Sequence, residues 1–434
     1  MSGAPALAAL RGVRYGSAAP EKMAGVICPP YDVISPEQQA ELYERDPHNA
    51  IRLEFGRIEA QDAPGENRYT RAAATWREWL AQGVLAQDDA PSIYPYRQGF
   101  LLHGEERRRG GMFCLLRLEE FERRLMLPHE GTLSAPKADR LELMRTCQAQ
   151  LSPVLALFKD RSGSVSSLLA AVCQGDPLVR AELPGESHAL WRCKRRDWIQ
   201  EVFGLLDEGP FFIADGHHRY ETALNLRNEL RARHPEAPAN AAFNYVLVLL
   251  VNADDPGLVI LPTHRLLRLG ADDLALLERL VGERFRVEAI AGSPGDLHVE
   301  SLLAEQAGNG TVYAWYTPGD GYRLLKPKEA PAADESPTAS LDVRILHERL
   351  LDVVLTQANQ TLQVKYLTDA RTAVAAVESG DYQAAFLLNP TPVEQVLQVA
   401  LAGERMPGKS TYFYPKAPTG FVMSPIAPDE RAGW

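Results

Sequence analysis

The sequence predicts an α/β chain of mixed α+β type, with an N-terminal region over residues 1–120 and a core over residues 121–434. Two strand-like runs flank a polar turn and predict a hairpin within residues 92–117. A buried strand at residues 210–215 is followed directly by a helical pattern. The C-terminal part alternates strand-like and helical segments, which indicates an α/β layer.

The elements before the hairpin are a loop and two helices. Prolines punctuate residues 29–36, so this stretch is expected to be an extended loop. Helical patterning covers residues 37–45. A stronger helix is expected over residues 67–82, where Tyr69, Ala73, Trp76 and Leu80 share one face.

The elements after the hairpin follow from the same two periodicities. Strands are expected at residues 151–158, 210–215, 243–251, 258–261, 364–367 and 384–388. Helices are expected at residues 190–206, 217–232, 370–379 and 392–401, and the last is followed by a polar loop over residues 403–411.

Composition excludes several classes of protein. The net charge of -11 provides no global positive field for a nucleic-acid partner. The five cysteines are odd in number and form no C-x-x-C pair, which fits a reducing cytosol better than a disulfide scaffold. The longest apolar run, Tyr245 to Val251, has the length of a strand, so we expect a cytoplasmic protein without a membrane partner.

The most informative segment is the expected strand, turn and helix from Phe211 to Leu224. The strand delivers Asp215 to its carboxyl end, and Gly216 allows a tight turn. His217, His218 and Arg219 then open the helix, where free N–H groups and the positive dipole end also lie. This arrangement predicts a phosphate-binding site.

Asp215 needs a separate explanation, because a carboxylate does not bind an anion. It suits Mg²⁺, a substrate amine or a histidine. The structural alternative is that Asp215 caps the helix. A zinc site on His217 and His218 is disfavoured, since adjacent helical residues point about 100° apart.

A second segment, residues 127–141, presents a carboxylate on a loop bracketed by Pro128 and Gly131. His129 and Glu130 lie within it, and Thr132, Ser134 and Lys137 add hydroxyls and a cation. Such a set could deprotonate an alcohol and neutralise phosphate charge. The alternative is a polar loop, with Ser134 or Asp139 capping a helix that starts near residue 138.

Two more segments are candidates for ligand contact. Residues 403–410 satisfy the pattern G-x-x-x-x-G-K-S, but a helix is expected before them and a strand after, so a Walker P-loop is rejected. Phosphate contact by Lys409, Ser410 and Thr411 is retained. In the proline loop, Tyr31 and Asp32 could line a pocket, with a structural turn as the alternative.

These segments together resemble the family of unknown function DUF1015. The resemblance covers nearly the full length, and its stretches are CPPYDVIS (28–35), PHEGTLSAPKADRLELM (128–144), FIADGHHRYETAL (212–224), ILPTHR (260–265) and MPGKSTYFYPK (406–416). A subset of them, in the same chain order, is similar to the free L-serine kinases of the ParB/sulfiredoxin-like superfamily. The fold that this implies is a ParB/sulfiredoxin-like nucleotide-binding core with an added N-terminal region and insertions.

The resemblance also implies roles for the candidate residues. The catalytic set is Glu130 as general base on the serine hydroxyl, with Asp215 and His218. The nucleotide phosphates are bound by Gly216, His217, Arg219, Lys409, Ser410 and Thr411. Apart from the resemblance, the residue types of the two loops place His129, Thr132, Lys137, Tyr31 and Asp32 on the expected substrate side. The implied reaction converts L-serine and ATP or ADP, with Mg²⁺, to O-phospho-L-serine, and no metal ligands are assigned.

Two other classes remain as alternatives. The first is a non-catalytic nucleotide-binding regulator of the ParB-like superfamily, which has no need of a base at Glu130. The second is a redox enzyme like sulfiredoxin, which needs a cysteine in the turn where His217 stands. The acceptor, the choice between ATP and ADP, and the assembly state, a homodimer included, stay open.

Overall fold

The computed structural model describes residues 4–16, 20–132, 134–207, 209–290, 298–308, 310–329, 336–357 and 363–433. The chain forms two compact units. Unit 1 comprises Met1–Pro128, Thr132–Val259 and Pro415–Trp434, and unit 2 comprises His129–Gly131 and Ile260–Tyr414. The tripeptide His129–Gly131 therefore belongs to unit 2, although its neighbours on both sides belong to unit 1.

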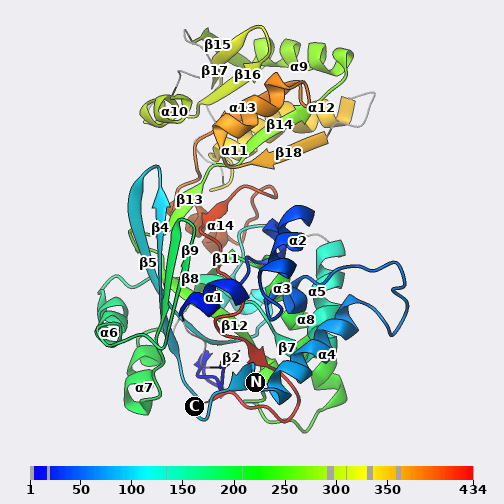
Figure 1. The fold of residues 1–434 in the computed structure, drawn as a ribbon. Coiled ribbons are helices and arrows are strands. Elements are labelled where there is room, and N and C mark those ends of the chain that lie inside the picture. The colour runs from blue at the N-terminus through cyan, green and yellow to red at the C-terminus, as the bar shows by residue number, and fades with distance from the viewer. Residues whose placement is uncertain are drawn as a thin grey trace. The chain divides into compact units, whose positions relative to one another are not determined.

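Unit 1 is built on a 9-stranded sheet with the order β6-β11-β8-β12-β5-β4-β10-β9, and β1 pairs with β5 (Figure 1). These strands are β1 (Leu7–Ala8), β4 (Tyr94–Leu102), β5 (Glu105–Arg117), β6 (Met126–Leu127), β8 (Val154–Phe158), β9 (Val179–Leu183), β10 (Glu186–Leu190), β11 (Phe211–Asp215) and β12 (Tyr245–Asn252). The expected hairpin is confirmed as β4 and β5, which pair from Tyr94 opposite Phe113 to Leu102 opposite Glu105.

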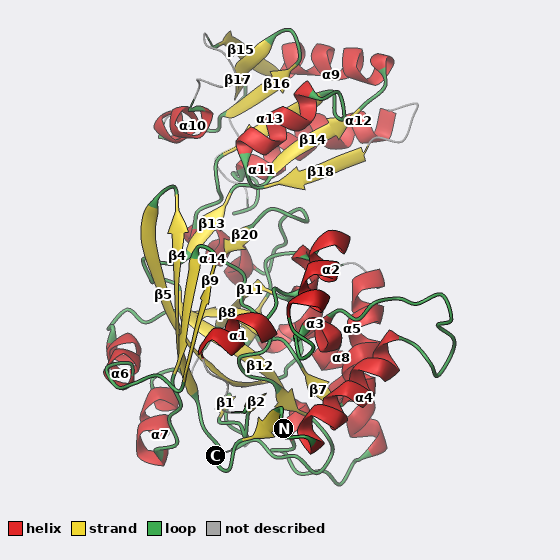
Figure 2. Ribbon diagram, viewed as in Figure 1, coloured by secondary structure: helices red, strands yellow, loops and turns green. Residues whose placement is uncertain are grey.

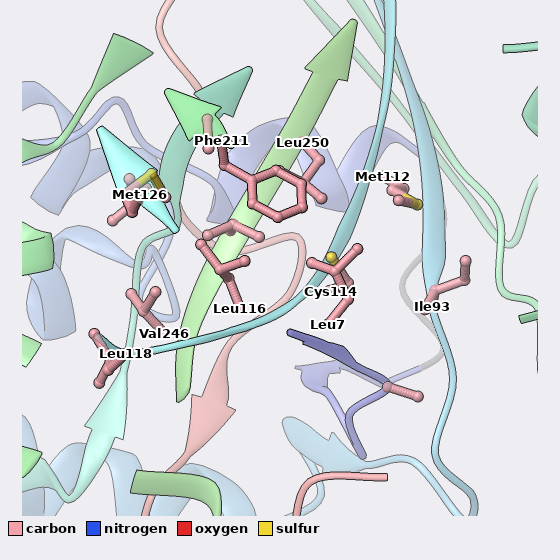
Figure 3. Close-up of a cluster of buried hydrophobic side chains, with 14 of the residues drawn as sticks. Leu7, Ile93, Met112, Cys114, Leu116, Leu118, Met126, Phe211, Val246 and Leu250 are labelled. Atoms are coloured by element: carbon pink, nitrogen blue, oxygen red, sulfur yellow. The ribbon is translucent and has the colours of Figure 1, made fainter. Parts of the chain in front are cut away.

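One face of this sheet is buried in the main apolar core. Alternate residues of a strand point to the same face, so Met112, Cys114 and Leu116 of β5 lie in line with Val246 and Leu250 of β12. Figure 3 shows this cluster together with Phe211 and Met126. Side chains from helices α6, α7 and α8 complete the core. The end of β11 is therefore anchored on a packed layer.

The helices of unit 1 are α1 (Pro20–Val26), α2 (Pro36–Arg45), α3 (Ile51–Glu54), α4 (Arg68–Ala81), α5 (Ser134–Cys147), α6 (Ser164–Val172), α7 (Arg196–Gly204) and α8 (His217–Arg233). Short 3-10 helices cover Tyr31–Val33, Phe121–Arg123 and Ala242–Asn244. Both N-terminal helices expected from the sequence start at capping boxes, α2 at Ser35 and α4 at Asn67. Two small sheets pair β2 (Val13–Tyr15) with β3 (Leu85–Gln87) and β7 (Ala149–Gln150) with β21 (Ser424–Pro425).

Unit 2 contains a 6-stranded sheet with the order β15-β17-β16-β19-β14-β18 (Figure 2). Its strands are β14 (His264–Arg268), β15 (Phe285–Ala289), β16 (Tyr313–Thr317), β17 (Gly321–Pro327), β18 (Gln363–Leu367) and β19 (Ala384–Leu388), and their pairings are antiparallel. Its helices are α9 (Ala271–Arg284), α10 (Val299–Ala307), α11 (Asp342–Leu346), a π-helix (His347–Leu351), α12 (Asp352–Gln357), α13 (Ala370–Glu378) and α14 (Val393–Ala402). Helices α10 and α13 pack in one apolar cluster with the sheet.

Most expected elements are confirmed within one to three residues, but two expectations need comment. The helix expected over residues 190–206 is wrong at its start, because Glu186–Leu190 forms strand β10 and α7 begins only at Arg196. The expected division at residue 120 does not coincide with the compact units. Strand β5, before that position, pairs along seven residues with β12, after it.

Among the helices of the described residues, none combines the length and the apolar character needed to cross a membrane. The ParB/sulfiredoxin-like core stays a prediction.

Candidate functional site

The first group of site residues lies at the carboxyl end of β11, in unit 1. The strand ends at Asp215, and Gly216 follows with a backbone φ of 90° as the N-cap residue of α8. A β-carbon at this position would lie 2.9 Å from Nε of Arg219. Only glycine combines this left-handed conformation with so close an approach.

The carboxylate of Asp215 is held between two cations. Nζ of Lys416 lies 2.5 Å from Oδ1, and the Arg219 guanidinium donates to Oδ2. Burial alone would raise the pKa of Asp215, but the charges of Lys416 and Arg219 outweigh it and hold that pKa far below its usual range. We call Asp215, Gly216, Arg219 and Lys416 the strand-end cluster.

This geometry bears on the roles considered for Asp215. Because both carboxylate oxygens contact cations, the residue is not placed as a metal ligand. The helix-cap alternative is not realised either, since α8 has Gly216 as its N-cap and no side-chain cap. Within the described part of the chain, no group of three or more His, Cys, Asp or Glu side chains could hold a metal ion.

Lys416 was not singled out from the sequence, and a buried arginine explains its placement. Arg109 on β5 is 1% exposed and donates to the Pro415 carbonyl at 2.8 Å and to Oε1 of Gln98 at 2.6 Å. Burial lowers the pKa of Arg109. The main chain next to Lys416 is thus fixed to the sheet. A lone lysine after an aromatic strand carries no local signal of this role.

The proline loop packs beside the strand-end cluster, in the same unit. Tyr31 begins a short 3-10 helix, and the Arg140 guanidinium lies 4.1 Å from the centre of its ring. Burial raises the pKa of Tyr31 to about 12, against the opposing charges of Arg219 and Arg140. Asp32 is exposed. The structure therefore brings the first and the most informative sequence segments together.

Thr132 and Lys137 both contact a residue that the sequence did not single out. The Thr132 hydroxyl donates to Oε2 of Glu221 at 2.8 Å, and Nζ of Lys137 lies 2.9 Å from the same oxygen. Glu221 lies on α8 two residues after Arg219. These two predicted substrate-side residues thus lie near the start of α8.

The second group of site residues belongs to unit 2 and is centred on Glu130. Among the described residues, its Oε1 accepts hydrogen bonds from the Ser410 amide at 3.0 Å, the Thr411 amide at 3.2 Å and the Thr411 hydroxyl at 3.2 Å. We call His129, Glu130 and Lys409–Thr411 the loop cluster. Positions 130 and 410 are far apart in sequence, so spacing alone could not predict these contacts.

His129 joins the same network. Its Nε2 lies 2.9 Å from the Thr411 hydroxyl oxygen. The single proton of that hydroxyl is donated to Glu130, so the histidine nitrogen is the donor and carries a proton on Nε2. The His129 carbonyl also accepts from the Met406 amide at 2.8 Å.

Lys409 is the exposed member of the loop, and its backbone has a φ of 60°. Its carbonyl accepts from the Thr263 hydroxyl at 2.7 Å and from Nη2 of Arg265 at 3.2 Å. Burial lowers the pKa of Arg265 to about 10. The Ser410 hydroxyl donates to the Pro407 carbonyl at 2.5 Å. These contacts fix the backbone of the loop.

The rejection of a Walker P-loop is confirmed. Helix α14 ends at Ala402, before the loop, and strand β20 (Tyr412–Tyr414) follows it and pairs with β13 (Val259–Leu261). A P-loop requires the opposite order, a strand before and a helix after.

The predicted site residues thus fall into two sets, one in each unit. His217 and His218 open α8 next to Asp215 and Gly216, as expected. That the strand-end cluster and the loop cluster act on one ligand stays a prediction.

A family described as protein of unknown function, DUF1015, matches residues 7–344. The chain belongs to this family. The resemblance inferred from the motifs is therefore confirmed over residues 7–344, which contain four of its five stretches. No curated protein matches the sequence.

Solved structures similar to this DUF1015 chain include a conserved hypothetical protein from Pyrococcus furiosus, with 15% identity and a TM-score of 0.37 over 72% of this chain and 94% of that one. A free serine kinase in complex with AMP has 14% identity and a TM-score of 0.37 over 72% and 91%. SbnI with a C-terminal truncation, from Staphylococcus aureus, has 10% identity and a TM-score of 0.39 over 72% and 87%. At such TM-scores no residue role is transferred from them.

Proposed function

We propose that this chain is a small-molecule kinase that transfers a phosphoryl group from ATP or ADP to the hydroxyl of free L-serine, giving O-phospho-L-serine. The observation that carries the proposal is the strand-end cluster. It combines a tight glycine turn, the amino end of a 17-residue helix without a side-chain cap, and two little-exposed cations on Asp215. Backbone donors and cations of this kind bind phosphate groups.

The phosphate-binding role extends to the residues that the motifs single out. Gly216 forms the turn that leads into α8, and His217, His218 and Arg219 line the first turn of that helix. Lys409 is exposed, and its side chain is proposed as a further phosphate-binding cation. Asp215 orients Lys416 and Arg219 rather than the phosphates themselves.

Glu130 is the proposed general base. The serine hydroxyl transfers its proton to the Glu130 carboxylate while its oxygen forms a bond to the terminal phosphorus of the nucleotide. The bond from that phosphorus to the bridging oxygen breaks, and the electron pair leaves with the shortened nucleotide. Most of the catalysis then comes from positioning and from neutralising phosphate charge.

Mg²⁺ is proposed to enter with the nucleotide. No cluster of three metal-binding side chains occurs among the described residues, and Asp215 already contacts two cations. Mg²⁺ commonly keeps several waters and binds through substrate phosphates. His129, Thr132, Lys137, Tyr31 and Asp32 are proposed to form the acceptor side, with Glu221 added because it contacts both Thr132 and Lys137.

The test is an assay for phosphoserine. Purified protein is incubated with L-serine, Mg²⁺ and either ATP or ADP, and the product is measured by mass spectrometry. Glu130→Gln should lower kcat by about 100- to 10,000-fold, because it removes the base, while nucleotide binding persists. Glu348→Gln, on the surface of unit 2, is the control and should keep wild-type activity.

A non-catalytic nucleotide-binding regulator is the second candidate. It is favoured by the hydrogen bonds on Glu130 Oε1, which would also suit a purely structural carboxylate. Nucleotide binding by calorimetry without phosphorylation of any small hydroxyl acceptor would support this candidate. The kinase proposal also includes a ParB/sulfiredoxin-like core, a cytoplasmic location and a homodimer.

A further inference from the structure

The loop cluster contains an anion-binding arrangement that is filled by the protein itself. Lys409 has a left-handed backbone, which directs the consecutive amides of Ser410 and Thr411 toward one point. Consecutive N–H groups arranged in this way form concave anion sites. The anion at that point is the Glu130 carboxylate, and the Thr411 hydroxyl is a third donor to the same oxygen.

The strained backbone of Lys409 is held from the opposite side. A lysine at a φ of 60° has a strained backbone, which persists only where its surroundings fix it. Thr263 and Arg265 do so, since both donate to the Lys409 carbonyl. Strain of this kind clusters at functional sites. The loop is thus built to hold one carboxylate oxygen.

The network continues through Thr411 to His129. Nε2 of His129 donates to the Thr411 hydroxyl, and that hydroxyl donates to Glu130. The orientation of the carboxylate is therefore fixed by two amides, one hydroxyl and, through it, one imidazole. A general base needs this kind of support, because proton transfer requires a hydrogen-bonding geometry of the base toward the hydroxyl.

We propose that Ser410 and Thr411 are positioning residues for Glu130, and that they do not bind the nucleotide phosphates. This inference rests on the proposed function, and it departs from the role that the motif resemblance implies for these two residues. The amides that would contact a phosphate already donate to Glu130. Phosphate contact from this loop is then left to the Lys409 side chain.

The experiment compares Thr411→Val, which removes only the hydroxyl, with Thr411→Ser, which keeps it. Thr411→Val should lower kcat on the order of 10- to 100-fold, with the KM and the calorimetric Kd of the nucleotide changed less than twofold. Thr411→Ser should restore most of the kcat. Thr356→Val, at an exposed position of α12, is the matched control and should behave as wild type.

A stability measurement separates this inference from the kinase proposal. The denaturation midpoint is measured for Thr411→Val in the wild-type background and in Glu130→Gln. The shift should be at least twofold smaller in the second background, since the charged acceptor of the hydroxyl is then absent.

Each outcome has one meaning. A Thr411→Val variant with weakened nucleotide binding and unchanged kcat would make the loop a phosphate site and overturn the proposal. Equal midpoint shifts in both backgrounds would also overturn it. If the wild type phosphorylates nothing while the two shifts differ as expected, the kinase proposal fails and the contact to Glu130 is upheld.

Discussion

At the scale of single residues, the molecule depends on charges that are buried in pairs. Asp215 is 12% exposed and contacts Lys416 and Arg219, which are 10% and 6% exposed. Removing one member of a buried ion pair is costly, because the remaining charge keeps its desolvation without its partner. Asp215 neutralises two such cations, so its loss leaves both without their shared anion.

Asp215→Asn is therefore expected to lower the free energy of unfolding by about 3–5 kcal/mol. Urea denaturation followed by circular dichroism measures the change. Asp89→Asn serves as the control, because Asp89 pairs with Arg192 at an exposed position and should change stability little. Equal effects of the two variants would contradict a special role for Asp215.

The same residue gives a pH dependence with a definite sign. The pKa of Asp215 is lowered on folding, so its contribution is complete above its unfolded pKa of about 3.9. The contribution is lost as the pH falls below that value toward the lowered folded pKa. The wild type should thus lose stability more steeply than Asp215→Asn between about pH 4 and pH 2. Parallel curves would show that folding does not lower the pKa of Asp215.

At the scale of elements, the junction of β11 and α8 sets the candidate site. Gly216 provides the left-handed turn, and the first turn of α8 then follows directly from the buried strand. A side chain at Gly216 would strain the left-handed backbone, and its β-carbon would contact the guanidinium of Arg219.

Gly216→Ala is expected to destabilise the protein by about 1–2 kcal/mol from backbone strain alone. It should also weaken nucleotide binding, because the added methyl group displaces Arg219. Gly204→Ala, at the end of α7 in the same unit, is the control: its β-carbon would have no neighbour within 4 Å. Thermal unfolding and calorimetry with ADP measure both effects. Unchanged binding by Gly216→Ala would separate the turn from the nucleotide.

The sequence could predict this junction but not its partners. The apolar strand β11, Gly216 and the helical spacing of α8 lie in one continuous segment of sequence. The predicted bounds of the strand and the helix match the structure to within one residue. Lys416 reaches Asp215 across a separation of 201 residues, which no local pattern reveals. The start of α7 was missed because residues 191–195 contain no glycine or proline, and the N-cap residue Arg195 provides no side-chain cap that would mark the beginning of the helix.

At the scale of the whole chain, the two units have separate apolar cores. The sequence placed a boundary near residue 120 because it followed changes of pattern along the chain. The units are instead set by pairing between distant strands, such as β5 with β12. Strand pairing at long range depends on side-chain packing, which composition does not record.

Unit 1 should fold without residues 260–414. Gly257 approaches the backbone of Arg108, and the Pro415 carbonyl accepts from Arg109, so both ends of the deletion adjoin the same part of β5. A flexible linker of about six residues spans about 13 Å and should join them. Cooperative urea unfolding with a smaller m-value than the full chain is expected.

The shortened variant should produce no phosphoserine, because Glu130 loses the loop that holds it. A variant that binds a hydrophobic dye and lacks a near-UV signal would show instead that unit 1 depends on unit 2 for its packing.

The tripeptide His129–Gly131 lies far in sequence from the rest of unit 2, and this limits how unit 2 could be transferred between genes. Residues 260–414 alone, moved by recombination into another protein, would carry the amides of Ser410 and Thr411 but leave behind the carboxylate that they hold. A recipient would gain a loop with a strained lysine and no anion to stabilise it. Residues 129–131 and residues 260–414 are therefore expected to be inherited together. A homologue that lacks residues 260–414 should also lack an acidic residue at the position of Glu130.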